Sequence, residues 1–192
     1  MDILFVVVII YYSYKFIQVL MKMKRKVIFP ATTKEIAFIR KHPDKPLDLP
    51  TYSKQKVGII FHVIVLFLVV VMFVLGAFFQ LFDWPLYLLL FLPMANSYNL
   101  LNLFAIVEDG LISGSRFIAW RKIKSFQFVP IDINHKYYGY SKEANDGFEL
   151  KIKTKIFSSS CVVTSDEVKD KLSDILSKHV QESENKPVLE KQ

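Results

Sequence analysis

The feature that most constrains this chain is the gathering of its apolar residues into three long blocks. These blocks run over residues 3–21, 57–82 and 84–107, and the second and third contain no Asp, Glu, Lys or Arg. A helix needs roughly 20 apolar residues to cross a bilayer, whereas a soluble protein of this length would spread its apolar residues at helix or strand periods. The sequence therefore predicts transmembrane helices at residues 1–22, 57–82 and 84–106.

The first block is interrupted by Lys15 but still predicts a helix that stays in the mature protein. Asp2 precedes the block, and Lys22, Lys24, Arg25 and Lys26 follow it. A cleaved signal peptide has the opposite order, with positive charge before the apolar run. Lys15 lies within about two turns of the basic end, so its amine can reach the membrane surface by snorkelling.

Most of the positive charge lies between the first two blocks. From Lys22 to Lys56 the chain has ten Lys or Arg and three Asp or Glu. Basic residues favour the cytoplasmic side, so we expect residues 23–56 to form a cytoplasmic loop, with the N-terminus outside and the C-terminal domain inside the cell. Thr32 and Glu35 make a capping box that predicts a short helix in this loop. Charge placed beside a membrane favours the bilayer as a partner over nucleic acid.

The third block carries a polar stripe made of Asn96, Asn99 and Asn102. Residues three apart share one slowly rotating face of a helix, and amides are costly against lipid. The stripe predicts either packing within the helical hairpin or contact with a helix of another membrane protein.

From residue 104 onward the pattern changes to short strands followed by one helix. Asp109-Gly110 and Gly114-Ser115 are turn signals, and residues 148–154 alternate between apolar and polar side chains. Apolar residues then recur at helical spacing up to Val180. The expected fold class is membrane α plus α+β: three transmembrane helices and a small antiparallel β domain, residues 107–181, closed by one helix. We expect residues 182–192 to form a disordered tail.

Two short motifs carry a resemblance to a known family. The run Glu108-Asp109-Gly110-Leu111, followed by Trp120-Arg121-Lys122-Ile123, resembles bacterial PH-like-domain membrane proteins, in which a transmembrane hairpin precedes a small PH-like domain. The resemblance implies a PH-like C-terminal domain in which Gly110, Trp120 and Ile123 are architectural. Members of this broad group are linked to roles such as bacteriocin immunity and envelope maintenance, and most have no assigned role.

The sequence gives no indication of catalysis. It has no Gly-rich phosphate loop, no metal-spaced His/Cys cluster and no nucleophile elbow, so we expect no enzyme activity and no cofactor. Cys161, the one cysteine, lies in an apolar alternating run that predicts a buried thiol.

Two non-enzymatic functions fit these patterns. The first, which the sequence favours, is binding of a partner membrane protein, or a second copy of the chain, through the domain and the candidate helix-interaction residues Asn96, Asn99 and Asn102. The alternative is binding of anionic lipid headgroups at the inner leaflet, against which ordinary topology-setting charge must be weighed. Its candidate residues are Lys22, Lys24, Arg25, Lys26, Arg116, Arg121, Lys122 and Lys124.

Overall fold

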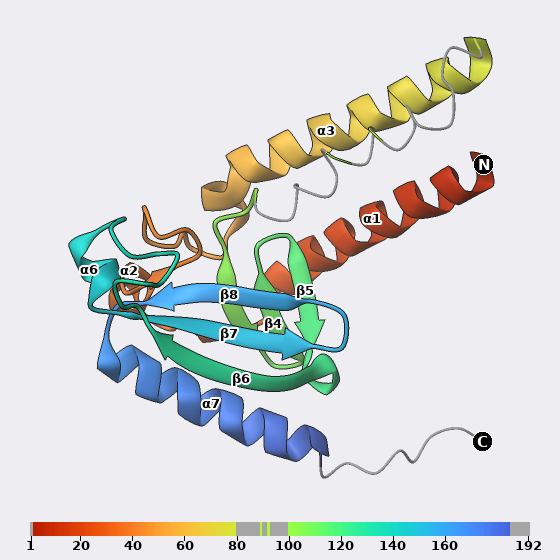
Figure 1. Cartoon of the computed structure of the whole chain (residues 1–192). Helices are drawn as coiled ribbons and strands as arrows, with labels where there is room; N and C mark the ends of the chain where they lie inside the picture. The colour runs from red at the N-terminus through yellow and green to blue at the C-terminus, as the bar shows by residue number, and fades with distance from the viewer. Residues whose placement is uncertain (1, 80–88, 90–91, 93–99, 185–192) are drawn as a thin grey trace, which may run out of the picture.

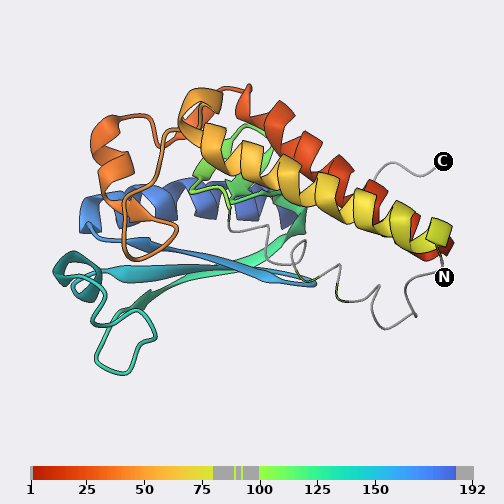
Figure 2. The same ribbon diagram turned by 90° about the horizontal axis from the view of Figure 1, so that it is seen from above.

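The computed structural model describes residues 2–79, 89, 92 and 100–184, and in it two long helices project from a β domain (Figure 1). These helices are α1 (Asp2–Met23) and α3 (Tyr52–Phe79). They run antiparallel, because Phe5 stacks on Phe73 with ring centroids 5.4 Å apart and Phe16 stacks on His62 at 3.7 Å. A view from above shows both helices leaving the domain in the same direction (Figure 2).

Within the described residues, two helices are long and apolar enough to cross a membrane. The expectation of three spans is not supported. Most of the predicted third helix, residues 84–106, including Asn96 and Asn99, lies outside the described residues. Its last three residues belong to a β-strand, Phe104–Val107. The physical reason is that this strand is buried on both faces, so its unbroken apolar run looks like a continuation of a membrane helix.

The β domain consists of two four-stranded antiparallel sheets. Sheet A has the order β1-β3-β4-β5, formed by Val27–Phe29, Phe104–Val107, Gly110–Ser113 and Arg116–Ala119. Sheet B has the order β2-β8-β7-β6, formed by Ile39–Arg40, Ser158–Val163, Phe148–Thr154 and Ile123–Pro130. The 3-10 helix η2 (Trp120–Lys122) joins the sheets, α6 (Lys142–Asn145) lies between β6 and β7, and α7 (Asp166–Glu184) ends the described chain.

The segment between the two long helices contributes a strand to each sheet. It contains the predicted short helix, α2 (Thr33–Ala37), with its capping box. It also contains β1, in which Val27 pairs with Val107, and β2, in which Ile39 pairs with Val163. The domain is therefore assembled from residues on both sides of α3, because α3 is inserted between two of its strands.

The strand register confirms the predicted turn at Gly114-Ser115 and places the first hairpin turn one residue earlier than predicted, at Glu108-Asp109. Val107 pairs with Gly110 and Ser113 pairs with Arg116, and Gly114 in the second turn has a φ of 58°. Gly110 has a different role from the one expected, because it begins β4. A Cβ on Gly110 would lie 2.3 Å from the carbonyl oxygen of Ile118, so the close approach of β5 requires glycine here.

The main core lies between the two sheets and α7. Leu150 and Ile152 of β7 and Leu172 and Leu176 of α7 are all 0% exposed, which agrees with the strand alternation and the helical spacing in the sequence. Cys161 is buried in the same core, and this burial raises the pKa of its thiol to about 12. The predicted buried thiol is confirmed.

A second cluster joins α1 to the outer face of sheet A. Phe16, Val19 and Met23, from the last turns of α1, pack with Ala105 and Val107 of β3. The helix therefore has two parts. Its first half leaves apolar side chains exposed, and its second half covers a sheet.

Candidate functional site

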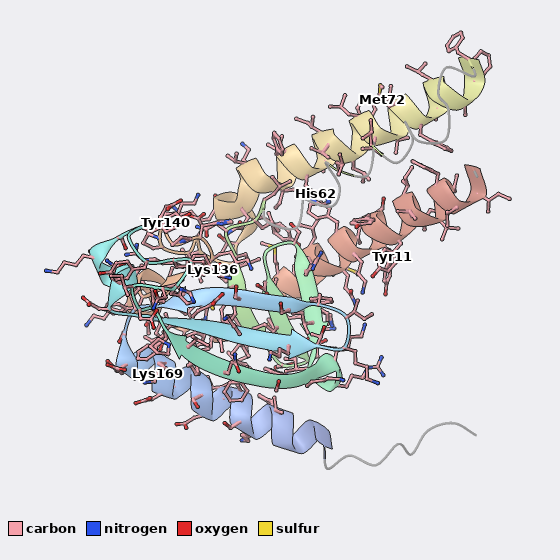
Figure 3. The ribbon with its side chains drawn as sticks, viewed as in Figure 1. Tyr11, His62, Met72, Lys136, Tyr140 and Lys169 are labelled. Carbon is pink, nitrogen blue, oxygen red and sulfur yellow. The ribbon has the colours of Figure 1, made fainter. Side chains whose placement is uncertain are left out.

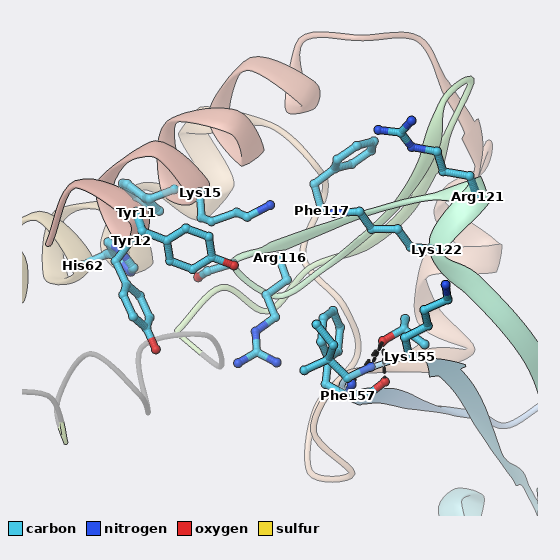
Figure 4. Close-up of a pocket in the computed structure, with 14 residues that line it drawn as sticks. Tyr11, Tyr12, Lys15, His62, Arg116, Phe117, Arg121, Lys122, Lys155 and Phe157 are labelled. Carbon is cyan, nitrogen blue, oxygen red and sulfur yellow. Dashed lines mark hydrogen bonds between the residues drawn. The ribbon is translucent and has the colours of Figure 1, made fainter. Parts of the chain in front are cut away.

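A pocket of about 560 Å³ opens where α1 meets the β domain (Figure 4). Its walls come from α1, from His62 of α3, from Ser115 and β5, from η2, and from the turn between β7 and β8. The volume is in the range of small-molecule sites, about 300–1,000 Å³. The pocket exists because the second half of α1 docks on sheet A while the β7–β8 turn extends past the edge of that sheet.

Five cationic side chains line this pocket, which we call the junction pocket. They are Lys15 of α1, Arg116 of β5, Arg121 and Lys122 of η2, and Lys155 of the β7–β8 turn. The described residues that line the pocket include no Asp or Glu. Charges of one sign in a concave site bounded by apolar walls reinforce one another's field, so the junction pocket attracts anions.

Aromatic rings position some of these cations. The Arg116 guanidinium lies 5.0 Å from the centre of the Phe157 ring, and the Lys15 amine lies 5.7 Å from the Tyr11 ring centre. Both distances lie within the range of cation–π contacts, about 6 Å. Figure 4 shows Arg116 and Phe157 facing the same cavity as Lys15.

The β7–β8 turn is held in shape by the side chain of Thr154. The Thr154 hydroxyl donates to the Phe157 carbonyl over 2.7 Å and accepts from the Phe157 amide over 3.1 Å. This closure presents the two intervening side chains, Lys155 and Ile156, at the mouth of the pocket. Ile156 is 91% exposed, an unusual degree of exposure for so apolar a residue.

Three of the predicted basic residues meet in the junction pocket, and the other five do not. Arg116, Arg121 and Lys122 line it. Lys124 is exposed on β6, outside the lining. The remaining four lie at the end of α1: Lys22 pairs with Asp109, Lys24 lies 5.8 Å from the Tyr52 ring centre, and Arg25 and Lys26 are exposed.

Sequence reasoning missed two members of the pocket. Lys15 was assigned only a snorkelling position, and Lys155 was assigned no role. The one local signal near Lys155 is the end of the apolar–polar alternation of residues 148–154, directly before it. No local signal connects Lys15 with Lys155, because their proximity depends on how α1 docks.

Asn102, the described member of the predicted asparagine stripe, is committed to contacts within the chain. Its side chain is buried, and its Nδ2 donates to the Pro46 carbonyl over 2.8 Å and to Asp48 Oδ2 over 3.1 Å. Its own carbonyl accepts from Gln55 Nε2 over 3.2 Å. These bonds fasten the chain entering α3 to the chain that leads into β3.

A buried lysine bridges the two sheets. Lys41 Nζ donates to Ser113 Oγ over 3.0 Å and to the Ser160 carbonyl over 3.1 Å, and burial lowers the pKa of this amine. A Ser–Lys pair can act in acyl transfer, but Ser113 is 2% exposed and its hydroxyl also accepts from Ser159 over 2.7 Å. The pair therefore fits a structural link between sheets, since its hydroxyl is closed off from substrate.

A buried carboxylate organises the long segment between β6 and β7. Glu149 is buried and is contacted by His135 at 2.9 Å, Lys136 at 2.8 Å and Lys151 at 3.1 Å. Burial by itself raises the pKa of Glu149, but the hydrogen bonds from these three residues outweigh it and lower that pKa below its usual value. Figure 3 labels Lys136 and Tyr140 in this segment, which Glu149 holds against sheet B.

One family model matches part of the chain. Residues 102–181 match the family model described as a domain of unknown function (DUF5673). The match covers β3 to β8 and most of α7, and so includes four cations of the junction pocket but not Lys15. No curated protein and no solved structure matched the chain. Across the described residues, no group of three or more His, Cys, Asp or Glu could hold a metal ion.

Proposed function

We propose that this chain is a non-enzymatic membrane protein that binds the anionic headgroup of a lipid in the junction pocket. The observation that carries the proposal is the convergence of Lys15, Arg116, Arg121, Lys122 and Lys155, with no carboxylate among the described lining residues, at the place where a membrane-capable helix meets the domain. Basic residues near an anionic bilayer surface contribute about 1 kcal/mol each to binding.

The proposal includes a placement in the membrane. We infer that α1 and α3 cross the bilayer, with the N-terminus outside and the β domain in the cytoplasm. Exposed apolar side chains on the first half of α1 support this, since Ile3 is 82% and Ile10 61% exposed. His62 to Phe79 of α3 extends about 26 Å at about 1.5 Å per residue, close to a hydrocarbon thickness of about 30 Å.

This placement puts the junction pocket at the level of the headgroups. Tyr11, Tyr12 and Tyr14 lie one turn from Lys15, and tyrosine is enriched where a helix passes the membrane–water interface. Beyond Phe16 the helix contacts sheet A and would lie outside the lipid. Lys15 then lies at the boundary between the part of α1 in the membrane and the part that packs on the domain.

We also assign the β domain to the PH-like architecture. The support is the order of its parts: two antiparallel sheets of four strands each, followed by a C-terminal helix packed on the core. The motif residues are compatible with this assignment, because Ile123 is buried in the core and Trp120 stacks on His179 of α7 at 4.3 Å.

The lipid hypothesis now has more support than binding of a partner protein. Two of the three asparagines on which the partner hypothesis was based, Asn96 and Asn99, lie outside the described residues. The third, Asn102, donates its side-chain amide to Pro46 and Asp48 of the same chain. A membrane-protein partner stays a prediction, and the described residues provide no surface that favours it.

The test is lipid retention by the full chain, purified in a neutral detergent and offered phosphatidylglycerol and phosphatidylcholine. Native mass spectrometry counts the lipids bound. The variant Arg121→Gln/Lys122→Gln/Lys155→Gln should bind phosphatidylglycerol at least tenfold more weakly, from about 1 kcal/mol lost per charge.

A matched variant removes the same charge elsewhere. Lys34, Lys142 and Lys178 are exposed and do not line the pocket, so their replacement by Gln should leave retention within twofold. Equal loss in both triple variants would mean that retention follows net charge alone, and the proposed site would be rejected.

A further inference from the structure

We propose that the ligand of the junction pocket is a lipid that ends in a phosphate monoester, in preference to a phosphodiester lipid. This inference rests on the proposed function and specifies its ligand. The two headgroup classes differ in charge: a monoester carries about −1.5 to −2 at pH 7, because its second ionisation has a pKa of about 6. A phosphodiester carries a single negative charge.

The first argument is charge balance. Five cations line the junction pocket, and no ion pair among the described residues uses Arg121, Lys122 or Lys155. Like charges held together repel one another, and this repulsion is relieved in proportion to the negative charge of the ligand. A dianionic group therefore gains more from this site than a monoanionic group does.

The second argument is the direction of the donors. Figure 4 shows Lys15 and Arg116 on the side of the cavity formed by α1 and β5, Lys122 on the side of η2, and Lys155 on the β7–β8 turn. A terminal phosphate has three free oxygens that can accept from separate walls. A phosphodiester has two, with an ester substituent on either side. Two guanidiniums in one site also favour phosphate, which their fork of N–H groups can bind bidentately.

The third argument concerns the source of the phosphate. Tyr11, which lines the pocket from α1, is 55% exposed, and Ile156, which lines it beside Lys155, is 91% exposed. Burying such an apolar side chain in the membrane interface is favourable, whereas the side chain gains nothing in water. A lipid can place its acyl chain against the apolar side chains of α1 and its phosphate among the cations of the pocket. Free phosphate contacts only the cations, so the lipid is the expected occupant.

The experiment is calorimetric titration of the full chain in a neutral detergent with three probes: dioctanoyl phosphatidic acid, dioctanoyl phosphatidylglycerol and inorganic phosphate. At pH 7.5 we expect phosphatidic acid to bind at least tenfold more tightly than phosphatidylglycerol. The preference should shrink toward unity at pH 5, because the monoester then loses its second charge. Inorganic phosphate should bind at least tenfold more weakly than phosphatidic acid at pH 7.5.

The other possible results of the titration each overturn a different part of the proposal. Equal affinity for the two lipids at pH 7.5, lost together in Arg121→Gln/Lys122→Gln/Lys155→Gln, would overturn the monoester preference and leave the proposed function standing. Binding of neither lipid would overturn the proposed function itself. Inorganic phosphate that binds as tightly as phosphatidic acid would overturn the lipid as the source. A preference that is unchanged in the pocket variant would place the monoester site elsewhere.

Discussion

The two sheets of the domain have the same number of strands but meet their surroundings in opposite ways. The two central strands of sheet A are buried on both faces: every residue of β3 and β4 is buried, with the core on one side and α1 on the other. Sheet B is buried on one face, and its outer face carries Lys151 and Lys153 beside the buried Glu149. The difference shows that α1 is both a membrane-capable helix and a structural layer that covers sheet A. On sheet B the outer face carries polar and ionic side chains instead.

The largest difference in stability between the two sheets is expected when an aspartate is placed on the outer face of each. Val107→Asp would bury an unpaired carboxylate between sheet A and α1, where Val107 is 0% exposed. We expect a loss of about 4 kcal/mol or more of stability, sufficient to unfold the domain or detach α1. Thermal unfolding of the full chain in detergent, followed by near-UV circular dichroism, measures the effect.

Its matched control is Lys153→Asp on the outer face of sheet B. This side chain is exposed, so the change should stay within about 0.5 kcal/mol. Similar stability in the two variants would show that α1 does not cover sheet A in the folded protein.

An intermediate effect is expected where sheet B has its own buried charge. Glu149→Gln removes the carboxylate that holds His135 and Lys136, and should cost about 1–3 kcal/mol at pH 7. The pKa of Glu149 is lowered by folding, so its stabilisation is present above the unfolded value of about 4.3 and is lost as the pH falls through the lower folded value.

The unfolding midpoint of the wild type should therefore fall more steeply from pH 6 to pH 3 than that of Glu149→Gln. Glu108→Gln, at an exposed position, should keep the wild-type profile. Parallel profiles for the wild type and Glu149→Gln would mean that this carboxylate contributes no pH-dependent stability.

The smallest effect is expected at the rim of the contact between α1 and sheet A. Asp109→Asn breaks the ion pair with Lys22, but Asp109 is 48% exposed, so solvent screens the pair. We expect a loss of at most about 0.5 kcal/mol, in the range of surface ion pairs. Thermal unfolding at low and high salt measures it. A loss above about 2 kcal/mol would show that the rim, and not the apolar cluster around Val19, holds α1 in place.

Several parts of the fold could be predicted because their signals are local. The helix α7 has apolar residues at helical spacing, β7 alternates, and the two tight hairpins of sheet A have turn residues. The strand β3 was harder, because an unbroken apolar run is expected both for a strand buried on two faces and for a helix in lipid. That ambiguity explains why the third predicted span was extended through residues 104–106.

By itself, the sequence predicted three apolar helices, two of which the described residues contain, and a small antiparallel β domain with a closing helix, because hydrophobic period and turn chemistry act over a few residues. The tertiary structure decided which distant segments meet. The strands β1 and β2 are too short to show a period, and they form by pairing with β3 and β8 from the other side of α3. For the same reason, Lys15 and Lys155 join Arg116, Arg121 and Lys122 in one pocket only through the docking of α1 on sheet A.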